Sequence, residues 1–298
     1  MKKEMVFLLF VILTSTQCTG QKYSKGWEDV NYAGDTLVSH RMDVYLPEIS
    51  QASYPAIVIV YGSAFFGDDM KEVAFKTLGK PLLKSGFAVV AVNHRSSRDT
   101  IFPAQIQDIK AAVRFIRARG HEYQIDPSFI GITGYSSGGH LSAMTGTSGS
   151  VKALEGHVGG NTAYSSSVNA VVDWFGPIDF QSMDSCGSTM VHDAPDSPES
   201  ILIGAPIQEN DELCALANPM SYIDSEDPPF LIFHGDKDPL VPHCQSEALF
   251  HALQKAGVPA QFVLVPGAKH GPGLFEEKYF RRMCDFFLTE YKKLNTEL

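Results

Sequence analysis

The chain has 298 residues, a formal net charge of −10 at pH 7 and a sequence pI of about 5.4. Hydrophobic residues make up 44% of it and charged residues 19%, which is the composition of a folded globular protein and not of a disordered one. An acidic protein repels nucleic-acid phosphates, and no cluster of lysine and arginine offsets this, so we expect no DNA or RNA partner.

The first twenty residues have the layout of a secretory signal peptide. Lys2 and Lys3 give a positive start, residues 5–13 form an apolar run too short to span a bilayer, and small and polar residues follow. We predict a signal peptide over residues 1–20, and so a secreted or periplasmic protein; the alternative is a plain N-terminal helix. Cleavage before Cys18 would leave a lipid anchor, as on a surface lipoprotein, although Gln17 departs from the small residue usual there.

After a polar lead-in over residues 21–36, short apolar runs alternate with stretches of helical period. An early strand with alternating polarity, expected at an antiparallel edge, covers residues 40–46. The predicted buried strands are residues 56–61, 87–92, 129–133, 170–175, 230–234 and 261–265. The predicted helices are residues 106–119, 246–255 and 276–293.

This alternation predicts an α/β fold with a mostly parallel sheet and helices on both faces. Such sheets carry their active sites at the carboxyl ends of the strands. Residues 181–211 interrupt the pattern because they are polar and rich in serine and proline. We interpret them as an insertion near the mouth of the site and not as a separate domain.

Residues 134–140 read GYSSGGH and contain a G-x-S-x-G motif between a predicted strand and residues 140–144, which can form a helix. In such a nucleophile elbow the turn is so tight that the serine takes strained backbone angles, and glycines remove side chains that would collide with neighbouring backbone. The motif predicts Ser136 as an exposed nucleophile. An ordinary glycine-rich turn is the alternative.

A serine hydroxyl needs a base to take its proton and an acid to orient that base, in the chain order serine, acid, histidine. His270 follows the strand at residues 261–265 and is the predicted base. Asp236 and Asp238 both follow the strand at residues 230–234, and the residues alone hardly separate them. Either could instead be an aspartate that caps a turn.

Residues 62–68, after the first buried strand, read GSAFFGD. Small residues let a substrate approach the backbone, so we expect the amides of Ser63, Ala64 and Ser137 to form an oxyanion hole. Phe65 and Phe66 are predicted to wall the acyl pocket, unless both point into the core. The alternative is a plain turn between a strand and a helix.

Four further cysteines, Cys186, Cys214, Cys244 and Cys284, permit two disulfides in an exported chain, with three possible connectivities, or four free thiols. His140 is expected to pack behind the elbow, and His234 ends a strand. The sequence has neither an H-E-x-x-H motif nor a CxxC pair, so we expect no metal and no cofactor.

Several motifs occur together in a fixed order. They are DVYLP at residues 43–47, YGSAF at 61–65, IDP at 125–127, GYSSGGHL at 134–141, WFGP at 174–177, PPFLIFHGDKD at 228–238 and GAKHG at 267–271. This order resembles that of the α/β-hydrolase esterases typified by bifunctional acetylxylan and feruloyl esterases, close to the hormone-sensitive-lipase-like group. The resemblance covers nearly everything after the predicted signal.

The resemblance implies an α/β-hydrolase catalytic domain over residues 21–298 with Ser136, Asp238 and His270 as its triad. It also implies release of acetyl or hydroxycinnamoyl groups from plant polysaccharide or a smaller glycan ester. The family usually has His-Gly-Gly-Gly-Trp where this chain has YGSAF, so the oxyanion loop is expected to take a slightly different path. The alternatives are a short-chain lipid esterase, a serine peptidase of the prolyl-oligopeptidase type and a binding protein without activity.

Overall fold

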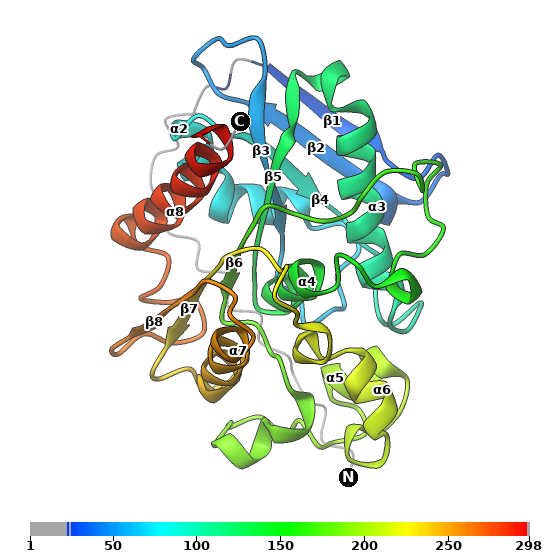
Figure 1. Cartoon of the computed structure of the whole chain (residues 1–298). Helices are drawn as coiled ribbons and strands as arrows, with labels where there is room; N and C mark the ends of the chain where they lie inside the picture. Colours follow the sequence, from blue (N-terminus) through cyan, green and yellow to red (C-terminus); the bar gives the residue numbers. More distant parts are fainter. Residues whose placement is uncertain (1–22, 24, 297–298) are drawn as a thin grey trace.

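The computed structural model describes residue 23 and residues 25–296, so the predicted signal peptide and Cys18 lie outside the described residues. Eight strands form one sheet in the order β1-β2-β4-β3-β5-β6-β7-β8 (Figure 1). In chain order the strands are β1 (Lys25–Asn31), β2 (Arg41–Leu46), β3 (Tyr54–Val60), β4 (Ala88–Val92), β5 (Ile125–Tyr135), β6 (Ala170–Trp174), β7 (Phe230–Gly235) and β8 (Ala260–Val265). The pairs β1–β2 and β2–β4 are antiparallel, and the other neighbouring pairs of this sheet are parallel.

Helices cover both faces of the sheet (Figure 1). They are α1 (Lys71–Ala74), α2 (Lys80–Lys84), α3 (Ala104–Arg119), α4 (Ser137–Thr147), α5 (Pro198–Ile203), α6 (Asp211–Leu216), α7 (Cys244–Lys255) and α8 (Glu277–Thr296). Val58 and Val60 of β3 belong to the apolar cluster that includes residues of α3, α4 and α7, whereas Ile57 and Ile59 belong to the cluster that includes α2 and α8. Since both faces are covered, successive strand residues are apolar, and the predicted α/β architecture is confirmed.

The N-terminal edge of the sheet differs from the prediction. Residues 21–36 are not only a polar lead-in, because β1 lies within them and pairs with β2. The early strand is antiparallel as predicted, but β1 and not β2 forms the edge. The described side chains of β1 are exposed or half-buried, and only Trp27 and Val30 among them pack against the apolar core, so backbone pairing places the strand without a clear apolar pattern in the sequence.

Two of the four cysteines of the described chain form a disulfide, between Cys186 in the insertion and Cys244 at the first residue of α7. Cys214 and Cys284 are buried and free, so the second disulfide permitted by the sequence does not form. These two thiols belong to the clusters on opposite faces of the sheet, and the sheet therefore separates them.

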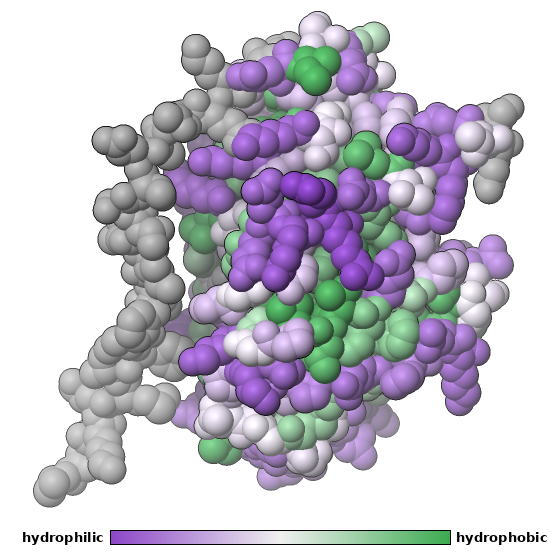
Figure 2. All heavy atoms as spheres, turned by 90° about the vertical axis from the view of Figure 1, so that its left-hand side faces the viewer, coloured by the Kyte–Doolittle hydropathy of each residue, from purple (hydrophilic) through white to green (hydrophobic). Residues whose placement is uncertain are grey.

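Helix α8 shows how the outer layer is built. Met283, Phe286 and Phe287 are buried against the sheet, while charged residues occupy the opposite side of the helix. The side of the molecule on which α8 lies is accordingly mostly hydrophilic, with a smaller apolar area within it (Figure 2). Among the residues that the structure describes, none of the helices has the length and apolar character needed to cross a bilayer.

Candidate active site

Ser136 lies between the last residue of β5 and the first residue of α4, with φ 56° and ψ −127°. Its amide donates to the carbonyl of Trp174 at 2.9 Å, which ties the turn to the neighbouring strand β6. A Cβ at Gly134 would lie 2.3 Å from the carbonyl oxygen of Gly138, and a Cβ at Gly138 would lie 2.4 Å from that of Tyr61. Because backbone atoms cannot yield as a flexible side chain can, both positions require glycine.

A chain of hydrogen bonds connects three side chains from three loops. His270 Nε2 lies 2.9 Å from Ser136 Oγ, and His270 Nδ1 lies 2.7 Å from Asp238 Oδ2. The Asp238 side chain is fully buried, and the imidazole packs edge-on against the ring of Phe175 with centroids 4.6 Å apart. The arrangement can pass a proton from the hydroxyl to an imidazole whose orientation is fixed by a carboxylate.

The carboxylate of Asp238 has further partners. Its Oδ1 accepts hydrogen bonds from the amides of Leu240 at 2.9 Å and Val241 at 3.1 Å, and His234 Nε2 lies 3.4 Å from Oδ2. Burial alone would raise the pKa of Asp238, but the hydrogen bonds from His234 and His270 outweigh it and hold the pKa well below its usual range. Asp238 is therefore ionised throughout the neutral range.

Asp236, the other candidate acid, has a different position. Its Oδ1 accepts a hydrogen bond from the amide of Gly267 at 2.6 Å, in the loop after β8. The structure thus brings Asp238 to His270. Asp236 instead stabilises a turn, which was the alternative role considered for either aspartate.

Two histidines outside this chain of hydrogen bonds support the site. His140 packs behind the elbow as predicted; it is fully buried, donates from Nδ1 to the carbonyl of Pro177 at 2.8 Å, and burial lowers its pKa to about 4. His234 does more than end a strand. Nε2 donates to the carbonyl of Val241 at 2.8 Å and Nδ1 lies 2.7 Å from the hydroxyl oxygen of Ser246, so the ring bridges β7 to α7.

The loop after β3 differs in detail from the prediction. The amide of Ser63 donates to Ser137 Oγ at 2.8 Å, so it is already engaged, whereas the amide of Ala64 has no acceptor within residues 25–296. Ala64 and Phe65 have φ of 51° and 65°, in the left-handed region that favours glycine. This loop therefore keeps glycine-like backbone angles without the glycines.

The two phenylalanines of this loop point in different directions. Phe65 is 1% exposed and packs edge-on against His140, with ring centroids 5.3 Å apart, so its predicted place in the acyl pocket is wrong. Phe66 lines a cavity of about 660 Å³ whose walls also include Ser136 and His270. The left-handed turn at residues 64–65 explains the difference, because it directs consecutive side chains to opposite sides.

The cavity is largely apolar. Phe66, Met70, Phe175, Leu240 and Phe275 contribute to its walls. The guanidinium of Arg98, which sequence reasoning missed, also lines it and lies 4.2 Å from the centroid of the Phe66 ring. In the described part of the chain, no three His, Cys, Asp or Glu side chains gather in a way that could hold a metal ion.

Comparison with known proteins agrees with this geometry. A family model, BD-FAE, matches residues 42–253. The chain belongs to the BD-FAE family. The resemblance seen in its motifs, to esterases near the hormone-sensitive-lipase-like group, is confirmed.

Several solved and curated proteins similar to this BD-FAE chain are named as esterases. It is 47% identical to a truncated carbohydrate esterase from gut microbiota, with a TM-score of 0.87 over 90% of this chain and 96% of that one. It is 49% identical to a bifunctional GH43-CE protein of Bacteroides eggerthii, with a TM-score of 0.85 over 89% of this chain and 35% of that one. Esterase LipQ of Mycobacterium tuberculosis is 32% identical over 72% of this chain and 50% of LipQ. The chain spans about half the length of the curated relatives it matches.

Proposed function

We propose that this BD-FAE chain is a serine carboxylesterase that removes acetyl or feruloyl groups from plant polysaccharide or oligosaccharide through an acyl-enzyme on Ser136. One observation carries the proposal: the hydrogen-bonded chain from buried Asp238 through His270 to Ser136, which ends in an apolar cavity. Such an arrangement activates a hydroxyl that would otherwise be a poor nucleophile.

The reaction follows from the positions of these groups. Neutral His270 accepts the hydroxyl proton at Nε2 while Ser136 Oγ bonds to the ester carbonyl carbon, and Asp238 stabilises the imidazolium that forms. The bond between the carbonyl carbon and the alcohol oxygen then breaks, and the alcohol leaves with the proton from His270. Water, deprotonated by the same imidazole, attacks the acyl-enzyme and releases the acid and free Ser136.

The tetrahedral intermediates carry a negative oxygen that needs amide donors. The free amide of Ala64 and the amide of Ser137, at the first residue of α4, are the proposed donors. The amide of Ser63 bonds to Ser137 Oγ, so it can join them only after that bond breaks.

Two kinds of observation support an exported enzyme that acts on glycan esters. The two structural relatives with 47% and 49% identity are named as a carbohydrate esterase and a GH43-CE protein. The Cys186–Cys244 disulfide is the kind of bond that persists in oxidising compartments, in agreement with the signal peptide proposed for residues 1–20.

A serine-directed fluorophosphonate probe and a substrate panel test the proposal. We expect wild type, but not Ser136→Ala, to be labelled and to hydrolyse p-nitrophenyl acetate, methyl ferulate or acetylated xylo-oligosaccharides. Absence of labelling would support a binding protein without activity. Labelling combined with turnover of aminoacyl p-nitroanilides alone would support a peptidase.

A further inference from the structure

The loop that carries Asp238 is held from outside by the insertion. The amide and the hydroxyl of Thr189 both donate to the carbonyl oxygen of Pro239, at 2.9 and 2.6 Å. The hydroxyl of Ser188 donates to the carbonyl oxygen of Leu240 at 2.8 Å, and His192 Nε2 donates to the same oxygen at 2.9 Å. Two consecutive carbonyl groups of the loop are therefore bonded to a segment about fifty residues earlier in the chain.

The same two peptide groups point their N–H bonds at Asp238. The peptide between Pro239 and Leu240 presents the Leu240 amide to Asp238 Oδ1 at 2.9 Å, and the next peptide presents the Val241 amide to it at 3.1 Å. In a planar trans peptide, C=O and N–H point in opposite directions. A contact that fixes the carbonyl oxygen thus also fixes the direction in which the amide hydrogen points.

His192 makes this contact as a cation. Its Nδ1 lies 2.9 Å from Glu199 Oε2 and its Nε2 lies 2.9 Å from the Leu240 carbonyl oxygen, and because both partners are acceptors, both ring nitrogens carry hydrogen. Burial would lower the pKa of His192, but the hydrogen bond to Glu199 outweighs it and raises the pKa above its ordinary value. Hydrogen bonds from a charged donor are stronger than neutral ones.

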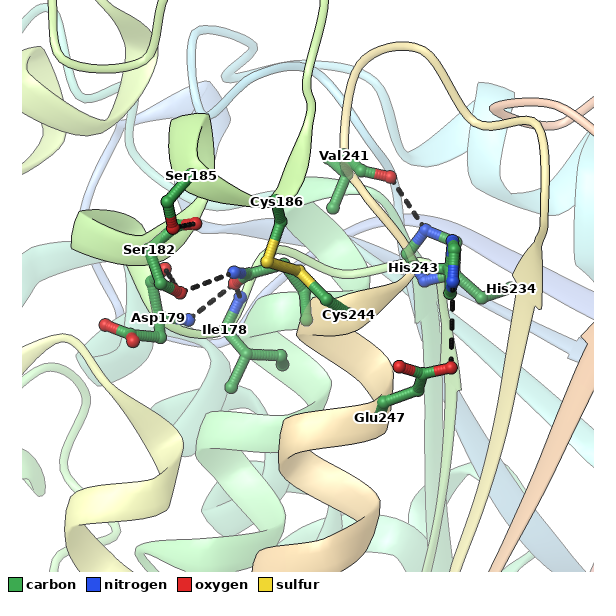
Figure 3. The surroundings of a disulfide bond; sticks show 11 residues. Ile178, Asp179, Ser182, Ser185, Cys186, His234, Val241, His243, Cys244 and Glu247 are labelled. Atoms are coloured by element: carbon green, nitrogen blue, oxygen red, sulfur yellow. Dashed lines mark hydrogen bonds and ion pairs between the residues drawn. A yellow bond between two sulfur atoms is a disulfide. The ribbon is translucent and has the colours of Figure 1, made fainter.

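The insertion is itself anchored beyond the loop. The Cys186–Cys244 disulfide joins it to the start of α7 (Figure 3). The side chain of Gln245, the next residue, accepts from the amide of Asp179 at 2.7 Å and donates to Ser182 Oγ at 2.9 Å. The segment that bonds to the loop therefore starts from a fixed point.

We propose that Ser188, Thr189 and His192 are positioning residues that hold the carboxylate of Asp238 toward His270 through the two intervening peptide groups. The inference rests on the proposed function, in which Asp238 stabilises the imidazolium of His270. None of the three residues is among those that line the cavity, which receives only Leu240 from this loop. Loosening them should therefore affect the chemical step through Asp238 more than substrate binding, which it can reach only through the Leu240 side chain.

The double variant Ser188→Ala/Thr189→Val removes two hydroxyl donors from side chains that are exposed or half-buried, so the fold should tolerate it. We expect kcat to fall about tenfold with a smaller change in KM, as the loss of two hydrogen bonds implies. The acid limb of the kcat/KM profile should move about 0.5 pH unit lower, because a displaced carboxylate stabilises the imidazolium less. The variant Ser188→Ala/Thr189→Ser, which keeps the hydroxyl at residue 189, should have much more of the wild-type activity than Ser188→Ala/Thr189→Val.

Ser185→Ala is the matched control, since its hydroxyl bonds only to the Ser182 carbonyl within the insertion. We expect this variant to match wild type in kcat and in the acid limb. Three results would overturn the inference: unchanged kinetics in the double variant, a change in KM larger than the fall in kcat, or a lower rate with an unmoved limb, which a smaller folded fraction would produce.

The inference can fail while the proposed function stands. If wild type hydrolyses esters but the double variant does so equally well, only the positioning role is wrong. If wild type hydrolyses none, the pH dependence of the His270 ring signals in NMR still tests the contact. The same shift toward lower pH in the double variant is then expected, and identical titrations in both proteins would refute the role.

Discussion

The two sides of the site are held in different ways. On the nucleophile side, Ser136 is fixed by its own strand and helix and by a backbone hydrogen bond to β6 at the middle of the sheet. On the acid side, Asp238 lies in a loop after β7, and its peptide groups are bonded to an insertion about fifty residues away. The nucleophile is thus positioned by contacts close to the motif, whereas the loop of the acid is bonded to a distant segment that a disulfide joins to α7.

The comparison predicts that substitutions around Asp238 lower the activity in smaller steps than substitutions at the elbow do. Close backbone contacts at Gly134 and Gly138 leave no room even for a methyl group. The acid loop, in contrast, is held by several separate side-chain hydrogen bonds, each of which contributes on the order of 1 kcal/mol. We therefore expect all-or-none effects at the elbow and graded effects around Asp238.

The largest effect is expected at the nucleophile. Ser136→Ala should lower kcat by roughly 10⁴- to 10⁶-fold, as loss of a triad nucleophile does. The melting temperature should stay near that of wild type, because the backbone bond to Trp174 does not involve the side chain. Steady-state assays and calorimetry measure the two quantities. A variant that retains more than about 1% of the activity would assign the nucleophile elsewhere.

On the acid side the two aspartates can be compared directly. Asp238→Asn should lower kcat by roughly 10²- to 10⁴-fold, since the amide cannot stabilise the imidazolium and favours the wrong tautomer. Asp236→Asn is the matched control, and it keeps an oxygen that can accept from the amide of Gly267. We expect less than about a threefold change there. Equal losses, or a larger loss at Asp236, would reassign the acid.

The pH dependence should separate activity from stability. The kcat/KM profile should rise with pH through a limb at about 6 to 7, the range in which an ordinary imidazole becomes neutral. Asp238 has a lowered pKa, so it contributes stability that is present above its unfolded value of about 4 and is lost as pH falls through the folded value. At pH 5 the protein should thus be folded by circular dichroism but poorly active; a flat rate profile from about pH 5 to 8 would contradict this.

The disulfide should matter more for stability than for rate. It closes a segment with a sequence separation of 58 residues, and Cys186→Ser/Cys244→Ser should lower the free energy of unfolding by about 2–4 kcal/mol. The hydrogen bonds of Thr189 and His192 remain, so kcat should fall by less than about threefold. Dithiothreitol should reproduce the effect in wild type and change nothing in the double variant. A folded double variant as inactive as Asp238→Asn would mean that the disulfide positions the acid.

The difference between the two sides also explains what the sequence could predict. The elbow, the buried strands and helices α3, α7 and α8 follow from local motifs and from the spacing of apolar residues, so the sequence predicts them. Strand β1 was missed because its described side chains are exposed or half-buried, and edge pairing leaves no clear apolar pattern. The bonds from Thr189 and His192 to the acid loop join residues about fifty positions apart and carry no motif.

The sequence also does not predict the direction in which a single side chain points. Phe65 and Phe66 are neighbours of the same type, and only the left-handed backbone at residues 64–65 decides which one is buried. Similarly, composition allowed two disulfides, but the position of Cys214 and Cys284 on opposite faces of the sheet allows one among the described cysteines.

The smallest expected effect concerns the acyl chain, and the two phenylalanines provide a matched pair. Phe66 walls the cavity on the nucleophile side and Leu240 on the acid side, so wild type should prefer acetyl over longer acyl groups on p-nitrophenyl esters by a modest factor. Each buried methylene contributes about 0.8 kcal/mol only where apolar space is open to receive it. Phe66→Ala opens such space, so its kcat/KM for butyryl relative to acetyl esters should rise roughly threefold, the worth of about one methylene.

Phe65→Ala should act on stability instead. Its ring is buried against His140, and its removal should lower the free energy of unfolding by about 3–5 kcal/mol while the butyryl-to-acetyl ratio stays at the wild-type value. Rates on acetyl, butyryl, octanoyl and decanoyl esters, together with denaturant unfolding, measure both quantities. If wild-type kcat/KM climbs steadily to octanoyl, Phe66 does not limit the pocket, and an ester of a longer fatty acid becomes the better substrate. If Phe65→Ala changes the chain-length ratio as much as Phe66→Ala does, the two sides of this turn are coupled and the pocket extends into the core behind the elbow.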